Sequence, residues 1–253
     1  MSGHSKWHNI QARKTSQDAK RGRIFTKLTK EIIIAARQGG GNVETNSRLR
    51  NAVEKAKKMG MPMDNIKRAI MRGTGELPGV TYEEFTYEAY GPGGTAFIIK
   101  ISTDNKNRTV SELRRLLAKF NGSLAESGSV SWNFESKGEI ELEPTDLSYD
   151  DLFMIAADAG AEDLEKNDDT FTIITSPKDI DAVKKKIEEK KIGIKSAEVV
   201  LRPKTTVKVT GEDAERVLKL CDELENHDDV EDYYTNYDIE ENELKKIVSE
   251  LGI

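Results

Sequence analysis

The sequence is poor in the residues that most often perform catalysis or bind metals. Its 253 residues include one cysteine, Cys221, and three histidines, His4, His8 and His227. A single cysteine excludes an intrachain disulfide and suits a reducing compartment. Cys221 shares a predicted helical face with leucines, so we expect a buried thiol there and no nucleophile. His4 and His8 have an i, i+4 spacing, but no nearby cysteine or carboxylate completes a metal site.

The chain also lacks the common catalytic and cofactor motifs. It contains no G-x-G-x-x-G, H-E-x-x-H or G-x-S-x-G pattern. The glycine-rich turn at residues 91–94 joins two predicted strands and lacks the Gly-Lys-Ser/Thr ending of a phosphate-binding loop. We therefore expect no enzymatic activity, no cofactor, no metal and no small-molecule substrate.

Long apolar runs are missing as well. The longest aliphatic run, residues 32–36, is far too short to cross a bilayer. The first residues are polar and charged, without the apolar segment of a secretory signal. We expect a protein that has no membrane partner and works in the cytoplasm.

Charge is plentiful, and it is unevenly distributed. Charged residues make up 33% of the chain and hydrophobic residues 36%, a balance that favours small domains with much surface over one large core. Residues 1–72 hold 17 Lys or Arg against 5 Asp or Glu, whereas residues 73–253 hold 22 against 40. The formal net charge of −6 therefore hides a basic beginning and an acidic remainder.

A predicted helix at residues 17–41 organises this basic part. Phe25, Leu28 and Ile32 fall within one arc of the helix, which is the pattern of a buried stripe. Four cations spaced 3-4-3 fall on the opposite arc: Lys20, Arg23, Lys27 and Lys30. Such a face is often simply solvated, but the acidic remainder of the chain favours a polyanionic partner for it. The alternative is an interaction scaffold, in which this face pairs with acidic segments such as residues 228–232.

The rest of the chain predicts an α+β protein. Two further helices, at about 46–59 and from residue 62, complete a three-helix domain that ends at the Gly-rich linker 73–79. Strands are expected at 81–90 and 95–102, followed by a helix that a capping box at Thr109–Glu112 begins. The order β-α-β-β-α-β from residue 130 to 201 is the ferredoxin-like pattern. A weak repeat of helix and strand, at 177–200 and 211–237, suggests two related α+β domains.

Two segments are candidates for binding phosphate. The first is the basic helical domain with its N-terminal arm, where Trp7 could stack on a base or pack on the helices. Further cations of that domain are Arg48, Arg50, Lys55, Lys57, Lys58, Lys67, Arg68 and Arg72. The second segment is 103–109, where Lys106, Asn107 and Arg108 flank the free N–H groups of a helix start. A well-capped helix explains part of that pattern but not its two cations.

Several segments resemble the motifs of the YebC family. They are residues 3–10 (GHSKWHNI), 18–22 (DAKRG), 46–50 (NSRLR), 61–66 (MPMDNI), 103–109 (TDNKNRT) and 128–134 (GSVSWNF). The resemblance runs almost end to end. It implies three domains: a helical domain at 1–76, a discontinuous α+β domain at 77–130 and 205–253, and a ferredoxin-like domain at 131–204 inserted into the second. Position 106 carries Lys where the family often has Arg, which keeps the charge but loses bidentate contact.

The resemblance also implies a function. YebC proteins are regarded as probable DNA-binding transcriptional regulators, and some relatives are translational activators associated with the ribosome. We therefore predict a non-enzymatic, nucleic-acid-binding regulator of gene expression, whose partner is DNA or structured RNA and whose further candidate partner is the ribosome. The residues predicted to contact nucleic acid are Lys6, Trp7, Arg13, Lys14, Lys20, Arg23, Lys27, Lys30, Lys106, Asn107 and Arg108.

Overall fold

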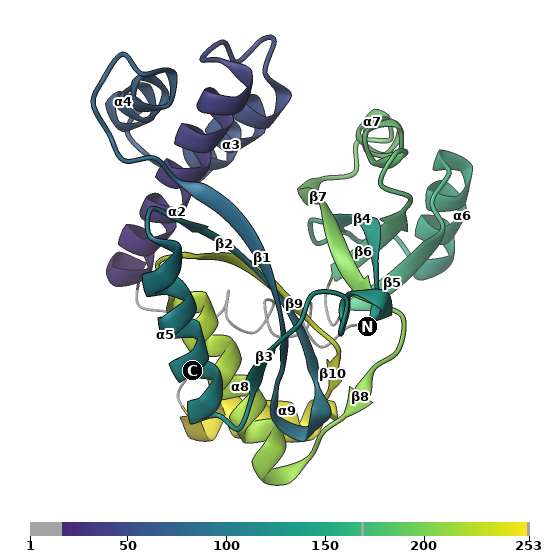
Figure 1. Cartoon of the computed structure of the whole chain (residues 1–253). Helices are drawn as coiled ribbons and strands as arrows, with labels where there is room; N and C mark the ends of the chain where they lie inside the picture. The colour runs from purple at the N-terminus through teal and green to yellow at the C-terminus, as the bar shows by residue number, and fades with distance from the viewer. Residues whose placement is uncertain (1–16, 168–169, 252–253) are drawn as a thin grey trace. The chain divides into compact units, whose positions relative to one another are not determined.

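The computed structural model describes residues 17–167 and 170–251, with side chains from residue 22 onward (Figure 1). Within these ranges the chain forms two compact units. Residues 131–208 and 234–238 make up one of them, and the remaining residues make up the other. Among the described residues, no helix is long and apolar enough to cross a membrane.

The larger unit begins with three helices, α2 (Gln17–Gly39), α3 (Ser47–Lys58) and α4 (Met63–Thr74), as the sequence predicts (Figure 1). Their apolar faces meet in one core, which includes Leu28, Ile32, Leu49, Val53, Ile66 and Ala69. Asn46 joins two of the helices. Its Oδ1 accepts a hydrogen bond from the N–H of Leu49 and caps α3, while its Nδ2 donates to the carbonyls of Ala35 and Gly40, each at 2.8 Å.

Gly73 allows α4 to lie directly against α2. A Cβ atom at this position would lie 2.5 Å from the carbonyl oxygen of Ile33 and 2.7 Å from the Cβ of Ala36. Those distances are shorter than real Cβ contacts, so any other residue would push the two helices apart.

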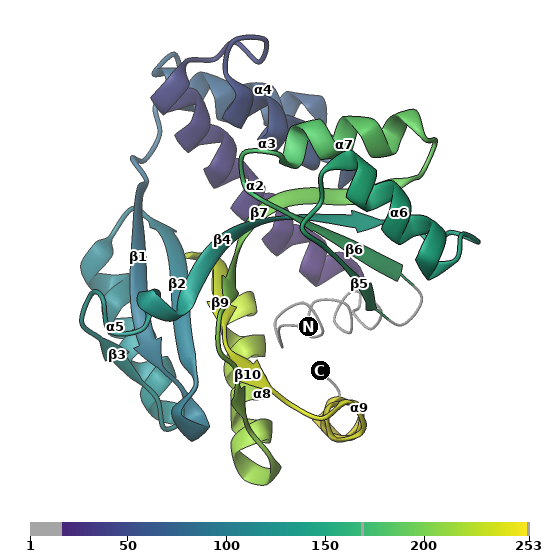
Figure 2. The same ribbon diagram turned by 90° about the vertical axis from the view of Figure 1, so that its right-hand side faces the viewer.

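A four-stranded sheet follows in the same unit. It contains β1 (Glu83–Tyr90), β2 (Ala96–Thr103), β3 (Ser123–Ala125) and β9 (Val230–Thr235), in the order β3-β1-β2-β9. The 3₁₀ turn η1 (Pro92–Gly94) joins β1 to β2. Helices α5 (Lys106–Lys119) and α8 (Gly211–Asn226) lie side by side on one face of this sheet (Figures 1 and 2). The terminal helix α9 (Glu241–Leu251) buries Leu244, Ile247 and Val248.

The strands of this sheet are arranged as in a ferredoxin-like domain, but one strand comes from a different place in the sequence. Starting at β2, the chain runs β2-α5-β3 and later α8-β9, which supplies three of the four strands and both helices. The remaining strand, β1, lies between β3 and β2 in the sheet but precedes both in the sequence. The second ferredoxin-like domain predicted from the sequence is therefore present in a permuted form.

The smaller unit holds the unpermuted arrangement. Its elements are β4 (Phe134–Leu142), α6 (Tyr149–Ala159), β5 (Asp163–Asn167), β6 (Thr170–Thr175), α7 (Ile180–Glu189) and β7 (Ile194–Pro203). The strand order is β5-β6-β4-β7 and all pairs are antiparallel, as in ferredoxin-like domains. Ile140, Leu152 and Val183 are part of the core between the sheet and its two helices. A short parallel pair, β8 (Val207–Lys208) with β10 (Tyr237–Asp238), belongs to this unit too.

One helix boundary differs from the prediction in a way that matters for function. Helix α5 begins at Lys106 and not at Thr109, because Asn105 provides the cap: its Oδ1 accepts a hydrogen bond from the N–H of Arg108 at 3.1 Å. Lys106 and Arg108 therefore stand in the first turn of the helix. Thr109 is buried inside the helix and caps nothing.

Candidate nucleic-acid interface

The cations of α2 face the end of α8. The Arg23 guanidinium donates a hydrogen bond to the side chain of Asn226, and the Lys27 ammonium donates to the carbonyl oxygen of Glu225 at 2.8 Å. These groups belong to the last turn of α8, where unpaired carbonyls carry partial negative charge. The charged stripe of the first helix is therefore in contact with the protein's own C-terminal region.

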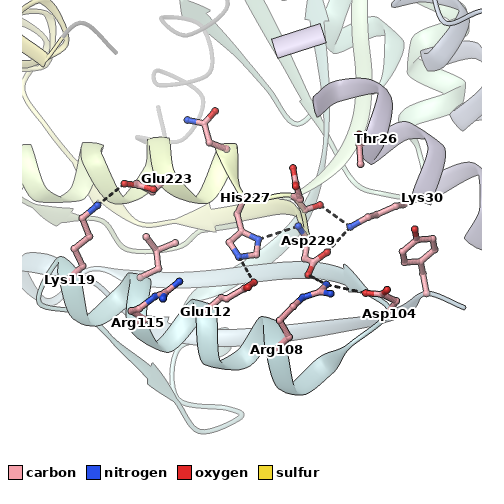
Figure 3. A pocket seen from close by; sticks show the side chains of 14 residues that line it. Thr26, Lys30, Asp104, Arg108, Glu112, Arg115, Lys119, Glu223, His227 and Asp229 are labelled. Carbon is pink, nitrogen blue, oxygen red and sulfur yellow. Dashed lines mark hydrogen bonds and ion pairs between the residues drawn. The ribbon is translucent and has the colours of Figure 1, made fainter. Parts of the chain in front are cut away.

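Lys30 extends this contact into the interior. Its side-chain nitrogen lies 2.7 Å from Asp229 Oδ1, and it also donates to the carbonyls of Asp228 at 3.0 Å and Ser102 at 3.3 Å. Figure 3 shows this contact between Lys30 and Asp229. Lys30 is only 6% exposed and Asp229 only 5%. A buried ammonium is tolerable only when anions and carbonyls replace its water, and this group has three such partners.

Asp229 accepts hydrogen bonds from three elements at once. Besides Lys30, its carboxylate takes one from Arg108 at 2.7 Å, one from the Thr109 hydroxyl at 2.7 Å and one from Thr103 at 3.2 Å. Burial by itself would raise the pKa of Asp229, but the hydrogen bonds from Lys30, Arg108 and Thr109 outweigh it and hold that pKa well below the usual range. This carboxylate stays ionised and joins α2, α5 and the segment before β9.

These contacts correct the predicted role of part of the stripe. Lys30 is not available to a phosphate, and Lys27 is occupied by the end of α8. Burial lowers the pKa of the Lys27 ammonium, which nearby acids such as Glu225 oppose. For Lys30, the contact with Asp229 matches the alternative in which the basic face pairs with residues 228–232. Helical spacing identifies the polar side of a helix but not the anion that it meets.

A groove between α5 and α8 contains the rest of this network (Figure 3). It has a volume of about 750 Å³, and a stripe of α5 spaced 4-3-4 lines one wall: Arg108, Glu112, Arg115 and Lys119. Two of these residues pair with the opposite wall. Lys119 lies 2.7 Å from Glu223, and Glu112 lies 3.3 Å from Nε2 of His227. Arg115 is exposed and, among the described residues, forms no ion pair.

The three residues of the predicted phosphate site at the start of α5 have different surroundings. Lys106 and Asn107 are exposed, with the Lys106 ammonium 4.4 Å from the centre of the Phe85 ring. Arg108 is bound to Asp104 at 3.0 Å as well as to Asp229, and its side chain is 44% exposed. Lys106 and Asn107 are therefore accessible, whereas Arg108 is held by the protein's own carboxylates.

The accessible positive charge lies on α3 and α4. Arg48 is an exception, because it pairs with Glu84 of β1 at 2.5 Å. Seven exposed cations of these helices and of the end of α2 form no ion pair within the described part of the chain: Arg37, Arg50, Lys57, Lys58, Lys67, Arg68 and Arg72. The sequence prediction counted most of them as basic residues of the domain but did not place them in the site. Lys57 and Lys67 each have one carboxylate three residues before them, Glu54 and Asp64, so the local spacing does not single these lysines out.

The remaining predicted contacts cannot be placed. Lys6, Trp7, Arg13 and Lys14 lie outside the described residues, and so does the side chain of Lys20. Of the eleven predicted residues, Lys106 and Asn107 are exposed and lie outside the internal network. Arg23, Lys27, Lys30 and Arg108 take part in its contacts, although Arg23 and Arg108 are exposed as well.

Two segments of the chain match descriptions of one protein family. Residues 5–76 match the family description "TACO1/YebC protein N-terminal domain", and residues 82–237 match "TACO1/YebC second and third domain". A protein of Thermotoga petrophila is 56% identical over 253 residues, covering 99% of each chain, and one of Dictyoglomus turgidum is 54% identical over 248 residues, covering 98% of this chain and all of that one. Both relatives are named "probable transcriptional regulatory protein".

A solved structure has the same fold. The crystal structure of a conserved hypothetical protein from Aquifex aeolicus is similar with a TM-score of 0.80 and 44% identity. The match covers 88% of this chain and 93% of that chain.

Proposed function

Because this chain belongs to the TACO1/YebC family, we propose that it is a non-enzymatic regulator of gene expression that binds the backbone of a nucleic acid through its helical domain. The name of these relatives, probable transcriptional regulatory protein, supports the regulatory role and favours DNA as the partner. The proposal places the protein in the cytoplasm with its nucleic acid.

One observation carries this proposal. Lys57, Lys58, Lys67 and Arg68 are exposed on α3 and α4, and none of them forms an ion pair with a carboxylate of the described chain. The internal network uses Lys27 and Lys30, so these cations, not the first helix, form the candidate phosphate-binding surface. Lys106 and Asn107 at the start of α5 supply a second contact.

The chemistry of this surface is suited to phosphates more than to bases. Lysines are point charges that attract phosphates without reading a sequence, and the release of counterions drives such binding. Asn and Gln side chains, which read adenine, are scarce on these helices. Backbone binding accepts structured RNA as well as duplex DNA, so a translational role for the same surface is the alternative.

A charge-reversal experiment tests the proposal. The variant Lys58→Glu, Lys67→Glu, Arg68→Glu removes three cations of this surface. Its matched control is Lys178→Glu, Lys185→Glu, Lys190→Glu, which changes the net charge equally and alters exposed lysines in and beside α7. Binding of a labelled 25-base-pair duplex is measured by fluorescence anisotropy at several salt concentrations.

We expect the first variant to bind more weakly and to reduce the log–log salt slope by about two to three, since each lost phosphate contact removes about 0.9. The control is expected to keep the wild-type slope. Equal losses in the two variants would mean that net charge alone acts, and the helical surface would then have no special role.

A further inference from the structure

Exposed apolar side chains gather in one short segment of the inserted domain. Of the ten large apolar residues that are exposed in the described chain, four lie within residues 147–154: Leu147, Tyr149, Phe153 and Met154, the last at 61%. Three of them belong to α6, which lies beside α7 over one face of the inserted sheet (Figures 1 and 2). Single exposed apolar residues need no explanation, but a group of them on a folded domain indicates an interaction surface.

Helix α6 arranges this surface in two neighbouring rows. Residues four apart lie one above another on the same side of a helix. Six exposed residues form an apolar row and, beside it, a row with an acid at either end: Tyr149, Phe153 and Ala157 in the first, and Asp150, Met154 and Asp158 in the second. We call these six residues the α6 surface. The other side of the helix faces the core, where Leu152 and Ala156 are buried.

The two rings of the α6 surface are held in place from below. The Tyr149 hydroxyl donates a hydrogen bond to the carbonyl oxygen of Leu164 at 3.1 Å, and its ring centre lies 6.3 Å from that of the buried Phe171. Phe153 stacks on Tyr149, with 6.1 Å between the ring centres and 24° between the planes. Side chains that are already ordered lose little entropy when a partner binds, so this surface is prepared for one.

The two acids of the α6 surface are not neutralised by an ion pair. Asp150 and Asp158 are exposed, and neither forms such a pair within the described part of the chain. Asp150 stands in the first turn, where a negative charge stabilises the helix dipole, but Asp158 stands in the last turn, where it does not. Lys186 of α7 donates to the main-chain carbonyls of Asp158 and Ala159. The helix itself therefore does not account for a carboxylate at position 158.

We propose that the α6 surface binds an amphipathic helix of a basic protein partner, with apolar side chains on Phe153 and Met154 and a cation at each acid. Asp150 and Asp158 are eight residues apart, which is about 12 Å along a helix axis. A partner helix packed along α6 matches this spacing with Lys or Arg seven or eight residues apart and leucine-like residues between them. The inference goes beyond the proposed function, because it uses none of the cations of α3 and α4.

The charge of the α6 surface favours this occupant over the others. Asp150, Asp151 and Asp158 repel both a nucleic acid and an anionic membrane surface. A two-fold contact between two copies of α6 would bring the same acids of both copies together. A basic helix gains from the apolar rows and from the acids at once.

Two peptide probes test the surface on the full chain. One is an 18-residue amphipathic helix in which leucines form one stripe and lysines flank it, and the other carries glutamates in place of the lysines. Binding of each labelled peptide is measured by fluorescence anisotropy at several salt concentrations. We expect the lysine peptide to bind with an affinity that falls as the salt concentration rises, and the glutamate peptide to bind at least about tenfold more weakly. Equal binding of the two peptides, or no binding of the lysine peptide, would overturn the proposal.

An exposed apolar position shows where the lysine peptide binds. Met154→Lys puts a cation in the centre of the α6 surface and should weaken binding about tenfold or more. Its control is Val199→Lys on β7, which adds the same charge to another exposed apolar position and should change the affinity less than about twofold. If Met154→Lys weakens binding no more than Val199→Lys, the peptide binds elsewhere and the proposal is wrong. The melting temperatures of both variants are measured alongside.

A second pair of variants tests the acids. Asp150→Asn, Asp158→Asn should weaken binding of the lysine peptide about three- to tenfold and reduce its dependence on salt, since two exposed ion pairs are lost. The control Asp181→Asn, Glu189→Gln removes the same charge from exposed positions of α7. Equal effects of the two double variants would mean that net charge alone acts, which contradicts the proposed spacing.

The other possible occupants give different results. If the wild type self-associates in sedimentation velocity and Met154→Lys does not, a second copy covers the α6 surface. If phosphatidylcholine vesicles co-sediment with the wild type but not with Met154→Lys, a membrane covers it. Either result would overturn the proposal of a basic helix.

Discussion

Lys30 and Asp229 lie 199 residues apart in the sequence and form a buried ion pair with a 2.7 Å N–O distance. Each side chain is 7% exposed. The pair connects the first described helix to the segment before the last strand of the sheet. Several consequences of this connection can be measured.

Asp229→Asn should strongly destabilise the protein. The substitution removes the charge that compensates the buried Lys30 ammonium, and breaking one partner of a buried pair costs about 3–5 kcal/mol. Urea unfolding followed by circular dichroism measures the loss. The control is Glu223→Gln, which breaks the exposed pair with Lys119 and should cost less than about 1 kcal/mol. Equal costs would show that the pair at Asp229 is not special.

The same carboxylate should make stability depend on pH in the acid range. Because the pKa of Asp229 is lowered in the folded protein, the unfolded chain takes up the proton first as the pH falls. The contribution is complete above about pH 5, starts to fall near the unfolded pKa of about 3.9, and is lost as the pH approaches the folded pKa. The stability difference between wild type and Asp229→Asn should therefore shrink below about pH 4. A difference that stays constant from pH 7 to pH 3 would contradict this.

Two lysines should show opposite effects on stability and on nucleic-acid binding. Lys27→Met removes a cation at the end of α8 and should cost about 0.5–1.5 kcal/mol of stability without changing the salt slope. Lys67→Met, on exposed α4, should leave stability within about 0.5 kcal/mol and lower the salt slope by about one. If Lys27→Met also lowers the slope, Lys27 contacts phosphate after all.

Gly73→Ala should separate α4 from α2. Since its Cβ would lie 2.5 Å from the backbone oxygen of Ile33, we expect a loss of about 1–3 kcal/mol in the free energy of unfolding. Gly22→Ala is the matched control, because no atom lies within 4 Å of a Cβ there. In helix α2 that substitution should stabilise by up to about 1 kcal/mol. A harmless Gly73→Ala would mean that the helices can shift at little cost.

Local sequence patterns predicted the helices and strands better than they predicted which strands pair and which side chains meet. The helices of the basic domain and the ferredoxin-like order after residue 130 follow from periodicity and turn residues. The strand at Ser123–Ala125 was missed, because three residues are too few to show alternation and the strand is defined by its pairing with β1.

The start of α5 shows why the candidate site was only partly predicted. Thr109 and Glu112 match a capping box, and nothing local favours Asn105 over Thr109 as the cap. The Thr109 hydroxyl instead bonds Asp229, 120 residues away. The partners of Lys30 and Arg108 are equally distant, so no window of the sequence contains them. The exposed cations of α3 and α4 could be expected from composition, but their freedom from carboxylates depends on the folded structure.

The permuted sheet separates its strands in the order of synthesis. The strands β1, β2 and β3 emerge early, whereas α8 and β9 follow only after the whole inserted domain has been made. Until residue 229 leaves the ribosome, the ammonium of Lys30 lacks the carboxylate of Asp229 with which it pairs in the finished protein. Each nascent chain therefore passes through a stage in which its N-terminal part is more cationic than in the finished protein.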